Sequence, residues 1–107
     1  MKRVPARGDV WWLEPEDSPR RPFLVVSRQV VVDRLSSVIV VPATTRVRGI
    51  PTEVALDERD GMPTGCVLSL DNVTIQPKIV FRDWICTLDR YRMDDVCRAL
   101  ACAVGCD

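Results

Sequence analysis

Short apolar runs separated by turn residues recur along the chain and predict a mainly β protein. The run at 37–42 is apolar on both faces, so we expect it to be a central strand of the sheet. The segment 52–56 alternates polar and apolar residues, which is typical of a half-buried strand. The predicted strands are 9–13, 22–28, 37–42, 52–56, 65–70, 72–75 and 84–88, where 65–70 and 72–75 form either a strand pair or one bent strand.

One segment near the C-terminus has the apolar spacing of a helix instead. Asp89 is its predicted N-cap, and Gly105 can end it. The positions that step at helical intervals are Met93, Val96, Cys97, Leu100 and Val104. Strands followed by one helix predict a small bent antiparallel barrel with a C-terminal helix against it, and we expect connections at 14–21, 29–36 and 44–51.

The length of 107 residues allows one domain, 1–107, in which residues 1–6 are expected to be a loose basic leader. No signal peptide is visible after Met1, and no run approaches the roughly 18–20 apolar residues of a membrane span. Five cysteines make a closed set of disulfides unfavourable. We therefore expect a cytoplasmic protein with reduced thiols and no membrane contact.

Charge is balanced over the whole chain but not along it. Residues 1–50 carry nine bases and five acids, whereas residues 51–107 carry six bases and ten acids. Thirteen of the fifteen bases are arginines, whose planar guanidinium can donate two parallel hydrogen bonds to a phosphate. Any anion site is therefore expected to draw on the first half of the chain.

Histidine is absent, which excludes histidine acid–base catalysis, Ser-His and Cys-His nucleophile pairs, and most zinc sites. No two cysteines have the C-x-x-C spacing of a metal or redox motif. Cys97 is interpreted as core packing of the helix, and the other thiols have no assigned function. We expect neither a metal nor a cofactor.

Two groups of residues that could take part in phosphate chemistry lie at the ends of neighbouring predicted strands. Arg21 stands where a loop enters the second strand, and Pro22 fixes the backbone directly after it. Thr44 and Thr45 follow the buried third strand. If these two strands pair antiparallel, Arg21 and Thr44 meet at one edge of the barrel, with Arg46 and Arg48 close by.

At this point the chain resembles the MazF/PemK ribonuclease toxins of toxin–antitoxin systems, over residues 6–105. Matching segments in the right order and at the right spacing carry the resemblance. They are Arg7-Gly8-Asp9-Val10-Trp11, Arg21-Pro22-Phe23-Leu24-Val25-Val26, Val40-Val41-Pro42-Ala43-Thr44-Thr45, Pro51-Thr52-Glu53-Val54-Ala55-Leu56 and Gly65-Cys66-Val67-Leu68-Ser69-Leu70-Asp71-Asn72-Val73, followed by Leu88 and the C-terminal helix.

The resemblance implies a barrel of the Src-homology-3 type, the PemK–CcdB fold, that works as a homodimer. It also implies sequence-selective cleavage of single-stranded RNA without a metal, which arrests translation and growth and is neutralised by a MazE-like antitoxin. The products are a 2′,3′-cyclic phosphate and a 5′-hydroxyl. Arg21 falls on the family's catalytic arginine and Thr44 on its catalytic threonine.

Further residues are weighed for roles around that pair. Thr45 is a candidate catalytic or substrate-binding hydroxyl, and Glu16 is a candidate general base. The candidate RNA contacts are Arg46, Arg48, Asn72 and Gln76, because arginine pairs with phosphate and amides read base edges.

The loop before Arg21 is shorter than in many members of the family, where a Gly-Ser-Glu run precedes the Arg-Pro pair. This shortness leaves open whether messenger RNA or a loop of transfer or ribosomal RNA is cut. Two other interpretations remain: a gyrase-binding toxin of the CcdB type on the same barrel, and a non-catalytic barrel that binds RNA or a partner. CcdB-type toxins lack the Arg-Pro and Pro-x-Thr pairing, which favours the nuclease.

Overall fold

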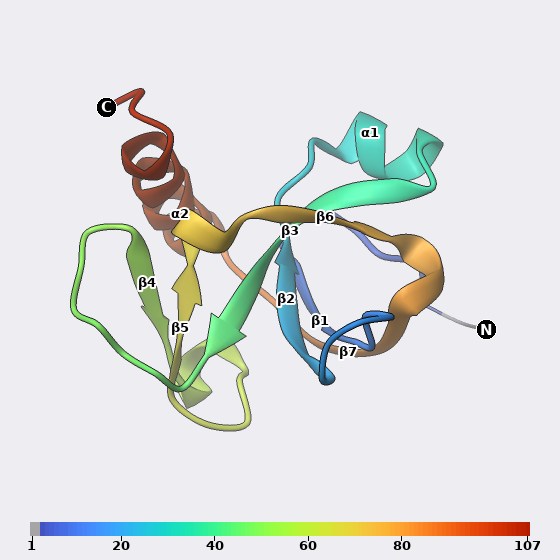
Figure 1. The fold of residues 1–107 in the computed structure, drawn as a ribbon, viewed down its shortest axis with the longest axis horizontal. Helices are drawn as coiled ribbons and strands as arrows, with labels where there is room; N and C mark the ends of the chain where they lie inside the picture. The colour runs from blue at the N-terminus through green and yellow to red at the C-terminus, as the bar shows by residue number, and fades with distance from the viewer. Residues whose placement is uncertain (1–2) are drawn as a thin grey trace.

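The computed structural model describes residues 3–107 and shows a seven-stranded antiparallel sheet with helices beside it (Figure 1). The strand order is β4-β5-β3-β2-β1-β7, and β6 also pairs with β3. The strands are β1 (Asp9–Leu13), β2 (Arg21–Val25), β3 (Ser37–Thr44), β4 (Glu53–Leu56), β5 (Cys66–Ser69), β6 (Thr74–Pro77) and β7 (Phe81–Thr87). The helices are α1 (Gln29–Arg34) and α2 (Arg90–Ala103), with short 3-10 turns η1 (Glu58–Asp60), η2 (Leu70–Asn72) and η3 (Lys78–Val80).

The long strand β3 organises the sheet, as its apolar run predicts. One of its sides pairs with β2. Its other side pairs with β6 over residues 37–40 and then with β5 over residues 43–44, so the sheet bends along this strand. The terminal strands β4 and β7 do not pair with each other within residues 3–107. The predicted bent, barrel-type, mainly β fold with a C-terminal helix is therefore confirmed, with the sheet left open.

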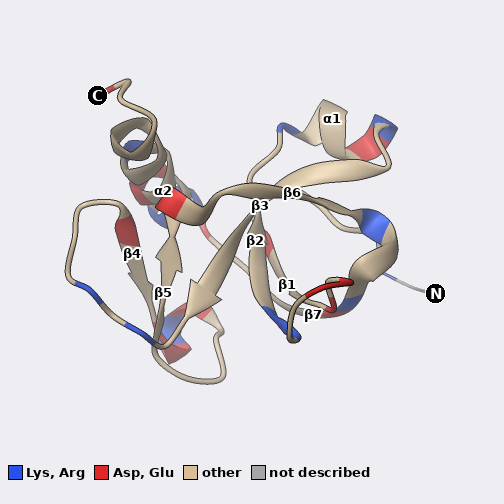
Figure 2. Ribbon diagram, in the orientation of Figure 1, with Lys and Arg blue, Asp and Glu red and all other residues tan. Residues whose placement is uncertain are grey.

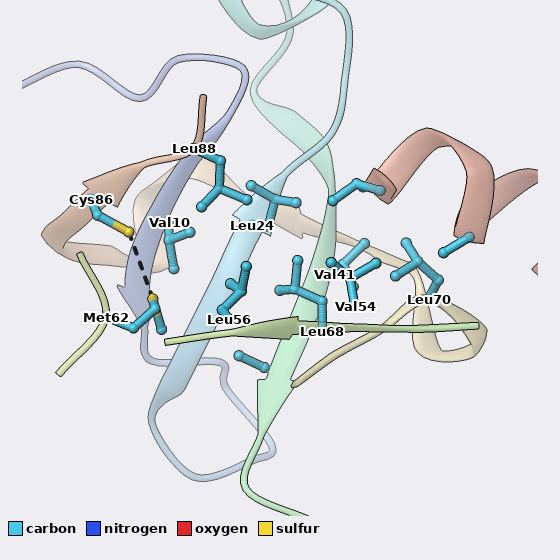
Figure 3. Close-up of a cluster of buried hydrophobic side chains, with 13 residues drawn as sticks. Val10, Leu24, Val41, Val54, Leu56, Met62, Leu68, Leu70, Cys86 and Leu88 are labelled. Atoms are coloured by element: carbon cyan, nitrogen blue, oxygen red, sulfur yellow. Dashed lines mark hydrogen bonds between the residues drawn. The ribbon is translucent and has the colours of Figure 1, made fainter. Parts of the chain in front are cut away.

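Two clusters of buried side chains lie on opposite faces of the central strands. In the first cluster Leu24, Val41 and Leu68 meet under α2, which contributes Val96 and Ala99 (Figure 3). The second cluster gathers under α1 and consists of Trp11, Leu13, Phe23, Val25, Val32, Val38 and Val40. Each fully buried aliphatic side chain contributes about 1.5–3 kcal/mol. Burial on both faces explains why the sequence of the third strand is apolar without alternation.

The helix α1 differs from the sequence prediction, in which 29–36 is a connection. It has six residues, fewer than two turns, and contains Val30, Val31 and Val32. Branching at Cβ lowers helix propensity, and only Val32 of this helix is buried. Tertiary packing of one valine therefore decides a structure that the local pattern does not show.

The C-terminal helix follows the sequence prediction closely. The Asp89 carboxylate caps its N-terminus by accepting the Arg92 N–H at 2.8 Å. Gly105 follows the helix with a φ of 75°, a left-handed conformation that suits glycine. The last strand, in contrast, begins at Phe81 rather than Trp84, because its exposed residues Arg82 and Asp83 hide the strand pattern.

The segment predicted as a loose leader is tied to the sheet at Arg3. Its guanidinium lies 3.4 Å from the buried Asp9 carboxylate and 4.1 Å from the centre of the Trp84 ring. Residues 1–2 of this leader lie outside the described residues. Over the described part of the chain, no helix has the length and apolar character that a membrane crossing requires.

Candidate anion-binding site

The pairing of β2 with β3 brings Arg21 and Thr44 together, as the sequence predicts. Phe23 lies opposite Pro42, and Leu24 lies opposite Val41. Continuing this register by two residues places Arg21, which begins β2, opposite Thr44, which ends β3. Both residues line one pocket at this end of the sheet.

This pocket encloses about 150 Å³ and has a cationic rim. Its lining consists of Arg21, Pro42, Thr44, Arg46, Arg48, Glu53, Ser69 and Asn72. Basic residues stand at the start of β2 and along the loop that follows β3 (Figure 2). We call this loop, residues 45–52, the arginine loop. With three arginines against one glutamate, the pocket is suited to a phosphate group.

The Arg21 backbone is held in the sheet, and its guanidinium makes no ion pair within residues 3–107. Its backbone pairs with Leu13 of β1, and Pro22 follows it. The side chain is exposed, and within residues 3–107 it makes no ion pair with a carboxylate. Its hydrogen-bond donors are therefore free to meet an anion from outside.

The Thr44 hydroxyl is oriented by the start of the arginine loop. Its Oγ1 accepts the backbone N–H of Arg46 at 3.1 Å, a local turn that threonine favours. A hydroxyl that accepts through a lone pair keeps its own proton for donation. Thr44 is half-buried and lines the pocket, so its hydroxyl is within reach of a ligand bound there.

Two polar residues of the pocket were not predicted as site residues, namely Glu53 and Ser69. Both carboxylate oxygens of Glu53 accept the Arg48 N–H, at 3.1 and 3.2 Å, and one also accepts the Gly49 N–H at 2.9 Å. Ser69 lies opposite Glu53 in the β4–β5 pair. Sequence reasoning treated both only as strand residues. The signal that could have found Glu53 is its position directly after the arginine loop.

Asn72 is the predicted base-reading residue that the structure does bring to the pocket. Its Nδ2 donates to the Ser69 hydroxyl at 2.7 Å, which fixes the orientation of the amide. The amide oxygen and one N–H are left for a ligand. The short turn η2 that carries Asn72 also ties back to the sheet, because Thr52 donates to Asp71 at 2.6 Å.

Three other predicted residues do not line this pocket. Thr45 is exposed beside it in the arginine loop. Gln76 lies in β6 opposite Val38, toward the other end of β3. Glu16 is exposed on the loop between β1 and β2.

A larger hollow of about 770 Å³ lies along β7 and the N-terminal segment. Its arginines are already paired: Arg3 with Asp9, Arg20 with Asp83 and Arg82 with Glu14. Internal carboxylates neutralise these cations. The smaller pocket is therefore the better phosphate site, because its arginine side chains have no such partners within the described residues.

The cysteines differ from the prediction at one position. Cys97 is exposed rather than part of the core, and the buried thiol is Cys86. Of the predicted apolar positions of α2, Val96 is buried and Met93 and Leu100 pack against the core, whereas Ala99 is buried in place of Cys97. Burial raises the pKa of the Cys86 thiol to about 11, which keeps it protonated and unreactive at neutral pH.

Metal ligands do not gather anywhere in the part of the chain that the structure describes. Residues 3–107 hold no group of three or more histidine, cysteine, aspartate or glutamate side chains that could bind a metal ion.

A small open barrel with a cationic, hydroxyl-bearing pocket is suited to binding a phosphate group, and comparison with known proteins identifies the family. Residues 6–104 match the model of the PemK-like, MazF-like toxins of type II toxin–antitoxin systems. The chain belongs to this family. The match favours the ribonuclease-toxin interpretation over the gyrase-binding alternative.

Individual relatives agree with this assignment. The probable endoribonuclease MazF5 of Mycobacterium tuberculosis (strain ATCC 25618 / H37Rv) is 38% identical over 107 residues, covering 99% of this chain and 98% of the relative. A solved endoribonuclease from Mycobacterial species is 30% identical, with a TM-score of 0.85 over 98% of this chain and 95% of that chain. An endoribonuclease in complex with its cognate antitoxin, also from Mycobacterial species, is 30% identical with a TM-score of 0.87 over 96% and 97% of the two chains.

Proposed function

We propose that this protein is an endoribonuclease toxin that cleaves single-stranded RNA without a metal, with Arg21 and Thr44 as its catalytic residues. The observation that carries the proposal is that both residues line one cationic pocket, where β2 begins and β3 ends. Membership of a family whose relatives are named endoribonucleases supports it.

The reaction assigned to the pocket is attack of the RNA 2′-hydroxyl on the adjacent phosphorus. The O2′–P bond forms and the P–O5′ bond breaks, while a base takes the 2′-hydroxyl proton and the departing O5′ gains a proton. Negative charge accumulates on the phosphoryl oxygens in between. Arg21 and the Thr44 hydroxyl stabilise this charge, and preorganised donors of this kind are worth about 3–4 kcal/mol each. The nucleophile belongs to the substrate, so no protein nucleophile is required.

The substrate contacts follow from what surrounds the pair. Arg46 and Arg48 pair with phosphates on either side of the cleaved bond, and Asn72 pairs with a base edge. Thr45 and Gln76 extend the contact beyond the pocket. Glu16 stays the candidate general base, and its test is the pH–rate profile of Glu16→Gln, which loses the acid limb if Glu16 takes the proton.

The experiment that tests the nuclease activity is digestion of total RNA in the presence of EDTA. Wild-type protein is expected to leave 2′,3′-cyclic phosphate and 5′-hydroxyl ends, and Arg21→Ala and Thr44→Ala are each expected to cut roughly 10²–10³-fold more slowly. Intact RNA, or both variants cutting at the wild-type rate, would reject the proposal. Inhibition of gyrase with RNA intact would favour the CcdB-type alternative. Mapping the cut ends assigns the target to messenger, transfer or ribosomal RNA.

We also propose that the protein acts as a homodimer. Ile39 of β3 lies opposite Ile75 of β6, and these side chains are 42% and 64% exposed. Adjacent exposed isoleucines on paired strands form an apolar surface that a second copy can cover. Sedimentation should give a dimer for wild type and a monomer for Ile75→Lys, whereas a monomeric wild type would contradict the proposal.

The last part of the proposal is that the protein acts in the cytoplasm, where a cognate antitoxin binds and neutralises it. A similar solved endoribonuclease is described as in complex with its cognate antitoxin. An acidic and apolar tail of a MazE-like partner would compete with RNA for the arginines of the pocket. Its addition should stop RNA cleavage and reverse growth arrest, and cleavage that continues with the bound partner would count against this role.

A further inference from the structure

Glu53 presents a physical problem for an RNA-binding pocket. It is the one acidic residue among those that line it, and a carboxylate repels the phosphates that the three arginines attract. Yet both of its oxygens are used, because they accept backbone N–H groups of the arginine loop. We therefore expect that the order which Glu53 gives the arginine loop favours RNA binding more than its negative charge opposes it.

The contact has the form of an anion held by consecutive amides. Gly49 has a φ of 71°, and this left-handed residue turns the chain so that the N–H groups of Arg48 and Gly49 converge. The Glu53 carboxylate fills the resulting concavity, and the Glu53 N–H closes the turn by donating to the Ile50 carbonyl at 3.1 Å. The arginine loop is thus clamped to the first residue of β4.

We propose that Glu53 is a positioning residue, which holds the arginine loop so that the Arg46 and Arg48 guanidinium groups lie along the bound RNA. This inference rests on the proposed RNA substrate. Glu53 acts through the two arginines and does not touch RNA. It is a poor candidate for the general base, because taking the 2′-hydroxyl proton would remove the negative charge that strengthens its hydrogen bonds from the Arg48 and Gly49 N–H groups.

The sign of the effect on RNA affinity separates positioning from plain electrostatics. If only charge mattered, removing the Glu53 carboxylate would tighten RNA binding. If Glu53 orders the loop, the same change frees the arginines and weakens binding. The salt dependence carries the same information, since each lost phosphate contact to a single strand lowers the slope of log Kd against log salt by about 0.7.

The experiment measures binding of a fluorescein-labelled pool of 2′-O-methyl oligoribonucleotides, which lack the attacking hydroxyl. For Glu53→Ala we expect a Kd raised at least about fivefold at physiological salt and a slope shallower by up to about 1.4, for two contacts. Glu53→Gln, which keeps one acceptor oxygen, should lie between wild type and Glu53→Ala. Glu58→Gln removes the same charge from the exposed turn η1 and is the matched control, with Kd unchanged or slightly lower.

A second variant keeps the test valid if Glu53→Ala does not fold. Gly49→Ala leaves all charges in place and meets no atom within 4 Å, but it strains the left-handed turn, so it should also raise Kd. Tighter or unchanged binding by Glu53→Gln and Gly49→Ala, or an unchanged salt slope, overturns the inference.

Cleavage of natural RNA in EDTA supplies the other readout. Positioning predicts that Glu53→Gln raises KM with kcat and the pH profile unchanged, since Arg21 and Thr44 are mounted on β2 and β3. A loss of kcat together with the acid limb of the pH profile would make Glu53 the base and overturn the inference. A wild-type protein that binds the oligoribonucleotides but cuts no RNA would defeat the proposed function while leaving the binding result decisive for Glu53.

Discussion

If Arg21 and Thr44 act on the same phosphoryl group, their contributions to catalysis must be coupled. The sheet register puts the two residues opposite each other, and both line the pocket. We therefore predict that a double-mutant cycle of Arg21→Ala and Thr44→Val is not additive. Thr44→Val keeps the shape of the side chain and removes its hydroxyl, and Thr44→Ser is the control that keeps the hydroxyl.

The magnitude follows from the hydrogen bonds at the site. Loss of one preorganised donor costs about 3–4 kcal/mol in the cleavage barrier, so each single variant should slow cleavage roughly 10²–10³-fold. Two donors that share one developing charge couple by about 0.5–3 kcal/mol, so the double variant should be correspondingly faster than the product of the single effects predicts. Thr44→Val also frees the Arg46 N–H, but that group is exposed and water can replace the hydroxyl, so stability should fall by about 1 kcal/mol or less.

The assay is single-turnover cleavage of one RNA in EDTA, with folding of each variant checked by circular dichroism. Thr44→Ser should stay within about tenfold of wild type, because its hydroxyl can still donate to the phosphate. Two results would refute the reasoning. A Thr44→Val rate within about threefold of wild type would show that the hydroxyl is not used, and additivity within about 0.5 kcal/mol would show that the residues act separately.

Three further predictions concern stability and thiol chemistry. Asp9 is fully buried and accepts hydrogen bonds from Ala6 N, Trp11 Nε1 and Thr87 Oγ1 at 2.7–3.1 Å. Asp9→Asn should therefore lower the free energy of unfolding, measured by urea denaturation, by about 3–5 kcal/mol. The control is the exposed Asp94→Asn, which should change it by about 0.5 kcal/mol or less. Gly61 has a φ of 97°, and an added Cβ would lie 2.7 Å from the Cys86 Cβ, so Gly61→Ala should lower the free energy of unfolding by about 2–4 kcal/mol. The control is Gly65→Ala, whose added Cβ meets nothing within 4 Å. Equal melting temperatures for the two variants would contradict the clash. Burial raises the pKa of the Cys86 thiol from 9.0 to about 11, so the unfolded chain loses this proton at a lower pH than the folded chain. The free energy of unfolding should therefore fall as the pH rises from 9 to 11, and it should fall less steeply in Cys86→Ala.

The central pair of the site could be predicted because it depends on strand pairing alone. Two apolar runs joined by a short connection pair antiparallel, which places the start of one beside the end of the other. Arg21 and Thr44 are then neighbours whatever the remaining chain does. Asn72 reaches the pocket through the 3-10 turn after β5, and the sequence suggests this residue by its amide, which can read a base edge, and not by strand pairing.

Glu53 and Cys97 show where sequence reasoning ends. The alternation of 52–56 assigns Glu53 to the polar face of a strand, but it contains no information on how the preceding loop folds back onto the carboxylate. For Cys97, the helical spacing of apolar residues fixes the centre of the buried helix face but not its edges. Val96 and Ala99 pack against the core, and Cys97 lies on the solvent side beside Arg7, whose guanidinium lies 3.7 Å from the sulfur.

A chain of zero net charge can still bind a polyanion if some of its cations are paired with carboxylates of the chain while others are left free at one site. The ion pairs of the described residues use Arg3, Arg20, Arg82, Arg92 and Arg98, and most are exposed pairs that contribute little to stability. These pairs place a carboxylate beside each arginine that lines the larger hollow and beside Arg92 and Arg98 of α2. Arg21, Arg46 and Arg48 are among the arginines that have no ion pair within residues 3–107, and these three gather in one pocket where β2 begins and β3 ends. This clustering, rather than the total charge, supports the proposed RNA site, and RNA binding should weaken with salt even though the isoelectric point of about 6.2 suggests an acidic protein.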